Sequence, residues 1–212
     1  MRMVLMAAAG FTGFFVMLSS LPAWSASHGT STASAGAATT VMLAATVLFG
    51  PLVPSLLRRV PTATTVAIGL IALGLPAPAL IWAPTGPPLY GICVIRGVGF
   101  AVFTVAGTLM TSEIAPPGRH GQVTGLYGLA AAVPSLIMIP LGVLLLHEVG
   151  FWPIALIAAL PALGATLALG SGWRRVTGPV VDAQPTARRE TRSAISRTLA
   201  PAAVLCAITI VG

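Results

Sequence analysis

The chain contains very few charged residues. Only 7% of its 212 residues are charged, only four are acidic, and none of its eleven basic residues is a lysine. A soluble domain uses roughly a quarter of its residues as charges to cover its surface. The shortage excludes a soluble fold and points to a protein that lives in lipid.

Residues that carry chemistry are also scarce. The two cysteines, Cys93 and Cys206, lie in apolar stretches without the spacing of a metal or redox site. The sequence has no metal-ligand cluster, no nucleophile–base pair and no phosphate-binding loop, so we expect no enzyme activity, no cofactor and no metal. The net charge of +7 does not indicate nucleic-acid binding, because the arginines flank apolar stretches, where they set membrane topology.

Long apolar runs dominate what remains. Apolar residues make up 56% of the chain, and the mean hydropathy is +0.96. About 20 such residues cross a hydrocarbon core of roughly 30 Å as a helix. We therefore predict an all-α integral membrane protein with six spans and the truncated start of a seventh. The predicted spans are 3–23, 36–57, 63–82, 88–111, 122–146 and 152–171, with the seventh beginning at 199–212.

One long hydrophilic segment divides the chain. Residues 172–198 hold six of the eleven arginines, and we interpret them as a linker between a six-helix bundle at 1–171 and the start of a second bundle at 199–212. Apart from Arg96, which lies inside the fourth span, the other arginines precede the first span or lie in alternate loops, whereas the loops 24–35, 83–87 and 147–151 have none. The positive-inside rule then places the N-terminus and the linker in the cytoplasm, in a multi-pass protein of the cytoplasmic (inner) membrane.

The loop after the second predicted span has a distinctive pattern. Its residues 50–59 read Gly-Pro-Leu-Val-Pro-Ser-Leu-Leu-Arg-Arg, which resembles the Gly-x-Leu-x-Asp-Arg-x-Gly-Arg-Arg loop of the major facilitator superfamily. Gly50, Leu52, Arg58 and Arg59 match in register, whereas Pro54 replaces the acidic residue. The stretch 95–100 is similar to a shortened form of that family's fourth-helix arginine motif, and 112–121 to its pattern of an acidic residue, then Pro, then Arg-Gly.

The resemblance implies a fold and a function. Members are permeases that carry a small solute through the bilayer by alternating access, between two six-helix bundles that each consist of two inverted three-helix repeats. This chain would be the N-terminal bundle, and the missing C-terminal bundle would be its partner. Two alternatives remain open at this point. The protein could be a half-size membrane protein that acts as a dimer, or a membrane scaffold that transports nothing.

Arg96 is the main candidate for a substrate or coupling site. It lies about 12 Å inside the fourth span, where an ionised side chain costs roughly 2.5 kcal/mol or more without compensation. It could face a cavity and bind an anionic group, or it could snorkel outward or pair with helix carbonyls. Because the six spans hold no Asp or Glu, proton coupling would need the missing bundle or Arg96 itself, and facilitated diffusion remains an alternative.

Two further groups of residues complete the predicted site. A cytoplasmic gating loop would join charges at the inner helix ends, with Glu113 pairing with Arg59 or Arg119. Small residues and prolines would allow close packing or bending of the fourth and fifth helices. The gating residues are Gly50, Arg58, Arg59, Glu113 and Arg119, and the packing residues are Gly97, Gly99, Gly107, Gly125, Pro134 and Pro140.

Overall fold

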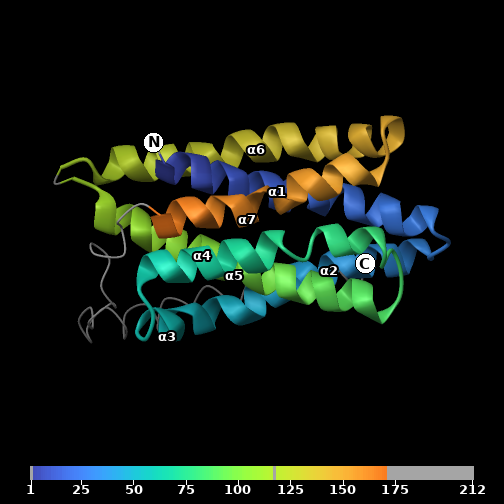
Figure 1. Cartoon of the computed structure of the whole chain (residues 1–212), viewed down its shortest axis with the longest axis horizontal. Helices are drawn as coiled ribbons and strands as arrows, with labels where there is room; N and C mark the ends of the chain where they lie inside the picture. Colours follow the sequence, from blue (N-terminus) through green and yellow to red (C-terminus); the bar gives the residue numbers. More distant parts are fainter. Residues whose placement is uncertain (1, 117, 171–212) are drawn as a thin grey trace, which may run out of the picture. The chain divides into compact units, whose positions relative to one another are not determined.

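The computed structural model describes residues 2–116 and 118–170, which are helical apart from short connections (Figure 1). The predicted linker at 172–198 and the predicted seventh span at 199–212 lie outside the described residues. The elements in chain order are α1 (Arg2–Ser27), α2 (Thr32–Phe49), η1 (Gly50–Leu52), α3 (Val53–Leu57), α4 (Thr62–Gly74), η2 (Pro78–Ile81), α5 (Pro87–Ile114), α6 (His120–Glu148) and α7 (Phe151–Gly170).

These elements form six segments that are long and apolar enough to cross a membrane, which confirms the six predicted spans. Their ends differ from the predicted ends by at most four residues, because the helices continue past the apolar stretches into small and polar residues. The segments are Arg2–Ser27, Ala33–Leu57, Thr62–Ile81, Pro87–Ile114, His120–Glu148 and Phe151–Leu169.

Proline and glycine account for the irregular points in the second and third spans. Pro51 and Pro54 have no backbone N–H, so the second span tightens into the 3₁₀ turn η1 before it ends in α3. Pro78 starts the 3₁₀ turn η2 at the end of the third span in the same way. Between spans, Gly86 and Gly150 have φ near +79° and +92°, a conformation that favours glycine over other residues.

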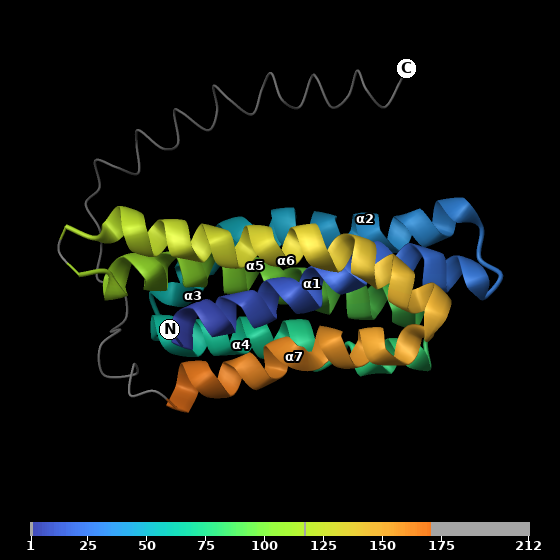
Figure 2. The same ribbon diagram turned by 90° about the horizontal axis from the view of Figure 1, so that it is seen from above.

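The packing of the six spans repeats after three. α1 packs mainly against α6 and α7, and α5 packs in the same way against α2 and α4, while α4 and α7 contact each other. If the first, second and third spans are exchanged with the fourth, fifth and sixth, the contacts of α1 with α6 and α7 become those of α5 with α2 and α4. The contact between α4 and α7 is unchanged by this exchange. Because each repeat has an odd number of spans, the two repeats run in opposite senses through the membrane, as predicted. In Figure 2, α2 and α6 lie on one side, α4 and α7 on the other, and α1 and α5 between them.

An aromatic cluster lies at the contact of α1, α5 and α6. Phe14 and Phe100 stack with ring centroids 3.6 Å apart, and Phe11 meets Phe103 and Tyr127 edge to face at 5.2 and 5.8 Å. Each such pair stabilises the contact by roughly 0.5–1.5 kcal/mol beyond the area that it buries. The cluster gives these three helices side-chain contacts that lipid tails cannot replace.

Candidate functional site

Arg96 is completely buried in the centre of the bundle, with 0% of its surface exposed. From α5 its guanidinium donates one hydrogen bond at 2.5 Å to the carbonyl of Leu73 on α4, and another at 3.0 Å to the carbonyl of Gly13 on α1. Its Nε has no hydrogen-bond partner. A single side chain therefore connects three helices through two backbone carbonyls.

The structure shows the Arg96 guanidinium paired with helix carbonyls, which is one of the arrangements considered for it. A role of Arg96 in substrate binding or coupling stays a prediction. The planar guanidinium can direct two donors to two helices at once, so the compensation that its charge requires comes from the backbone. Interhelical hydrogen bonds in membranes are worth about 0.6 kcal/mol on average and up to about 1.7 kcal/mol.

Glycines around Arg96 allow this close approach. A Cβ on Gly99 of α5 would lie 2.6 Å from the backbone nitrogen of Leu73, and a Cβ on Gly69 of α4 would lie 2.6 Å from that of Phe103. We call this backbone-to-backbone contact of Gly69 with Gly99 the α4–α5 seam. It brings α4 close enough for the Leu73 carbonyl to reach the guanidinium.

The other predicted packing residues differ in whether they contact a neighbouring helix. Gly97 lies directly against the carbonyl of Met42 on α2, and a Cβ on Gly107 would lie 2.6 Å from the Tyr127 hydroxyl. Gly125 of α6, by contrast, meets nothing within 4 Å, so within the described bundle it packs against no other helix. Pro134 and Pro140 both lie inside the continuous helix α6, the first buried and the second exposed.

The predicted gating residues lie at one end of the bundle, which we call the arginine end because it carries Arg2, Arg58, Arg59 and Arg119. Gly50 begins the turn η1, the exposed pair Arg58 and Arg59 follows α3, and Arg119 immediately precedes α6. These side chains share an end of the molecule but form no common cluster among the described hydrogen bonds.

Glu113 has a different partner from the one predicted. Its carboxylate accepts a hydrogen bond from the Thr62 hydroxyl at 3.2 Å, whereas the prediction was a pair with Arg59 or Arg119. The reason is that α5 continues to Ile114 and brings Glu113 beside the start of α4. No side chain caps that helix N-terminus, and such an end attracts a carboxylate.

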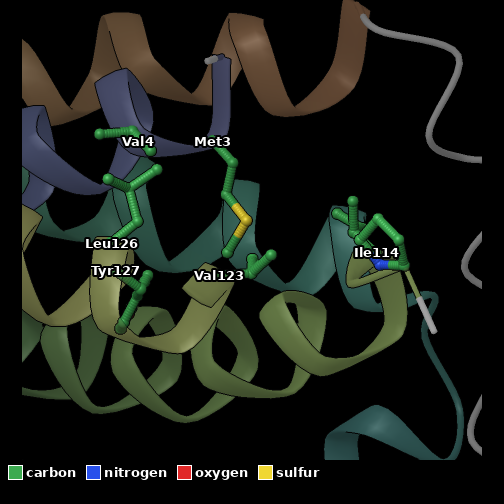
Figure 3. Close-up of a pocket in the computed structure, with 7 residues that line it drawn as sticks. Met3, Val4, Ile114, Val123, Leu126 and Tyr127 are labelled. Carbon is green, nitrogen blue, oxygen red and sulfur yellow. The ribbon is translucent and has the colours of Figure 1, made fainter. Parts of the chain in front are cut away.

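A cavity at the arginine end was not predicted. It has a volume of about 310 Å³ and lies where the first turn of α1, the end of α5 and the first turns of α6 meet (Figure 3). The lining is apolar, and Tyr127 closes one side. No pattern in the sequence could identify it, because it forms between residues more than 100 positions apart.

Comparison with known proteins assigns the family. No match is found among curated proteins. The model of the Major Facilitator Superfamily matches residues 3–212, which is nearly the whole chain. The six spans and the two inverted repeats agree with that match. The chain belongs to the Major Facilitator Superfamily of membrane transporters.

Proposed function

We propose that the chain forms the N-terminal half of a carrier that moves a small solute across the cytoplasmic membrane by alternating access. Family membership supports transport over a scaffold role. The two inverted repeats supply one bundle of the architecture in which a solute site forms between two bundles. The other bundle, on this proposal, packs against the side of α2 and α6.

The exposure of the helices is the observation that carries this proposal. In an apolar stretch of 18 residues, only 22% of the residues of α2–α3 and 17% of those of α6 are buried. The corresponding share is 56% in α1 and 50% in both α4 and α5. The exposed side of α6 also holds three glycines that meet nothing within 4 Å. Small residues of this kind let another helix approach closely. They are Gly121, Gly125 and Gly128.

The acidic residues constrain the coupling mechanism. Within the described spans, Glu113 and Glu148 are the only carboxylates, and each lies in the last two residues of its helix. A proton-coupled carrier titrates an ionisable group inside the membrane. The proposal therefore assigns any proton-binding carboxylate to the second bundle. Without one, coupling would need Arg96 itself, or the carrier would work by facilitated diffusion.

The 212-residue chain alone is expected to show no saturable solute uptake in liposomes, because half of the proposed site is missing. The same chain joined to its second bundle should transport. Spin labels at Val47 of α2 and Leu136 of α6 should become less accessible to oxygen when the second bundle is present, whereas a label at Leu163 of α7 should not change. Saturable uptake by the isolated chain would instead support the dimer model.

The proposed orientation can be tested with single cysteines at two exposed positions. Ser27 at the end of α1 and Gln122 in the first turn of α6 lie at opposite ends of the bundle. We expect a membrane-impermeant maleimide to label Ser27→Cys in intact cells and to label Gln122→Cys only after permeabilisation. A cysteine at Ser193 should behave like Gln122→Cys. The reverse pattern would place the N-terminus outside and contradict the topology.

A further inference from the structure

A second hollow lies beside the cavity at the arginine end, along α1 and α6. Met3 and Val4 of α1, Ile114 of α5, and Val123, Leu126 and Tyr127 of α6 line the cavity (Figure 3). Val4 and Leu126 also line a second hollow of about 230 Å³ that extends along α6 as far as Pro134. Because the two hollows share these two lining residues, they are neighbours, and we treat them together as one apolar path from the end of the bundle toward its middle.

The length of this path matches half of a bilayer. It runs from Val123 to Pro134 on α6, and eleven residues of helix rise roughly 16 Å. Half of a hydrocarbon core is about 15 Å thick. Because the path is apolar and runs along α6 from the arginine end of the bundle toward its middle, its dimensions fit an acyl chain of one leaflet.

Arginines lie next to the open end of the path in the sequence. Arg2 directly precedes Met3, and the exposed Arg119 lies one turn before Val123. No side chain caps the N-terminus of α6, so its free N–H groups add a positive partial charge. The carboxylate in the neighbouring sequence, Glu113, accepts a hydrogen bond from Thr62 of α4 and keeps its charge. Two arginines and a helix N-terminus outweigh this one carboxylate, so an anionic group is favoured at this opening.

We propose that this path is a binding site for an anionic phospholipid of the leaflet at the arginine end. One acyl chain lies between α1 and α6, and the phosphate headgroup lies near Arg119 and the start of α6. Basic residues beside a gap between membrane helices are a known mode of headgroup recognition. The site is independent of the proposed transport function, because it needs neither a solute nor a second bundle.

The test titrates the delipidated chain, in a neutral detergent, with phosphatidylglycerol or with phosphatidylcholine that has the same acyl chains. Bound lipid is counted by native mass spectrometry, and the melting temperature is recorded. The wild-type chain should bind one phosphatidylglycerol at low concentration and melt at a higher temperature. Phosphatidylcholine should bind at least five-fold more weakly.

Two classes of variant locate the site. Leu126→Trp and Val133→Trp fill the path, and both should weaken phosphatidylglycerol binding at least ten-fold. Leu126 is 49% exposed and Val133 is 46% exposed, so neither change crowds the core. The matched control is Leu136→Trp, at a position on α6 that is 76% exposed and lies outside the path, and it should bind normally. Arg119→Gln should weaken binding about five-fold, whereas Arg58→Gln should not.

Several outcomes would overturn the proposal. Equal binding of the two phospholipids would remove headgroup recognition, and normal binding by both path-filling tryptophan variants would place the lipid elsewhere. Oleate that competes as strongly as the phospholipid would make the ligand a free single-chain amphiphile. A melting shift with inorganic phosphate alone would reduce the site to an anion at a helix end.

Discussion

Arg96→Ala is expected to reduce uptake by the complete two-bundle carrier to background while leaving its abundance in the membrane unchanged. The variant loses both interhelical hydrogen bonds of the guanidinium, so α5 is no longer tied through this side chain to α1 and α4, although the α4–α5 seam remains. Membrane insertion should not suffer, because an arginine at a helix centre costs roughly 2.5 kcal/mol or more to insert, and alanine removes this cost at the stage before the helices pack and form the two hydrogen bonds. The measurement is uptake normalised to membrane protein level.

Two companion variants separate a positioning role from simple packing. Arg96→Met keeps most of the side-chain volume without the donors, and it should be as inactive as Arg96→Ala. Arg96→Lys should restore little uptake, because a compact ammonium cannot reproduce the guanidinium fork that reaches two helices. Near-normal uptake by the alanine variant would show that Arg96 only fills space. Full recovery with lysine or methionine would show that charge or volume alone is sufficient.

Gly99→Leu is expected to prevent folding of the bundle. Even a Cβ at this position would lie 2.6 Å from the backbone nitrogen of Leu73, and backbone atoms of α4 cannot move aside without separating the helices. Overpacking in a well-packed core costs about 1–3 kcal/mol and sometimes more, and here the separation also removes the bond between Arg96 and Leu73. The measurement is the yield of monodisperse protein after extraction in mild detergent.

The matched control for this prediction lies on the same helix. Gly91 of α5 is exposed and meets nothing within 4 Å, so Gly91→Leu should extract as well as the wild type. It could gain up to about 1 kcal/mol, because leucine favours a helix over glycine. Similar yields for the two leucine variants would mean that the α4–α5 seam tolerates a side chain and is not a close backbone contact.

The six spans could be predicted from the sequence because the requirement that lipid imposes on a helix depends only on consecutive residues. Every backbone polar group in the bilayer must be satisfied within its own helix, so about 20 apolar residues suffice to predict a span. The arginines of alternate loops then fix the crossing pattern. The aromatic cluster around Phe11 was not predicted, because residue spacing does not show which helix a given face will meet.

The partners of the polar side chains could not be predicted in the same way. Arg96 was recognised as costly, but its two acceptors are main-chain carbonyls, which every residue has, so no sequence pattern distinguishes Leu73 or Gly13. Glu113 binds Thr62 because two helix ends happen to meet. Gly125 has the same residue type as Gly99, yet only the latter lies at a helix contact. In each case the three-dimensional arrangement decides, and composition does not.

The α4–α5 seam has a mechanical consequence. Backbones in direct contact cannot slide past each other in small steps, because packed helices change register only by discrete jumps. α4 and α5 should therefore tilt together as one stiff body. When one end of this helix pair moves in one direction, the other end must move in the opposite direction. For the 28 residues of α5, with a half-length of roughly 21 Å, each degree of tilt about the midpoint moves either end by roughly 0.4 Å.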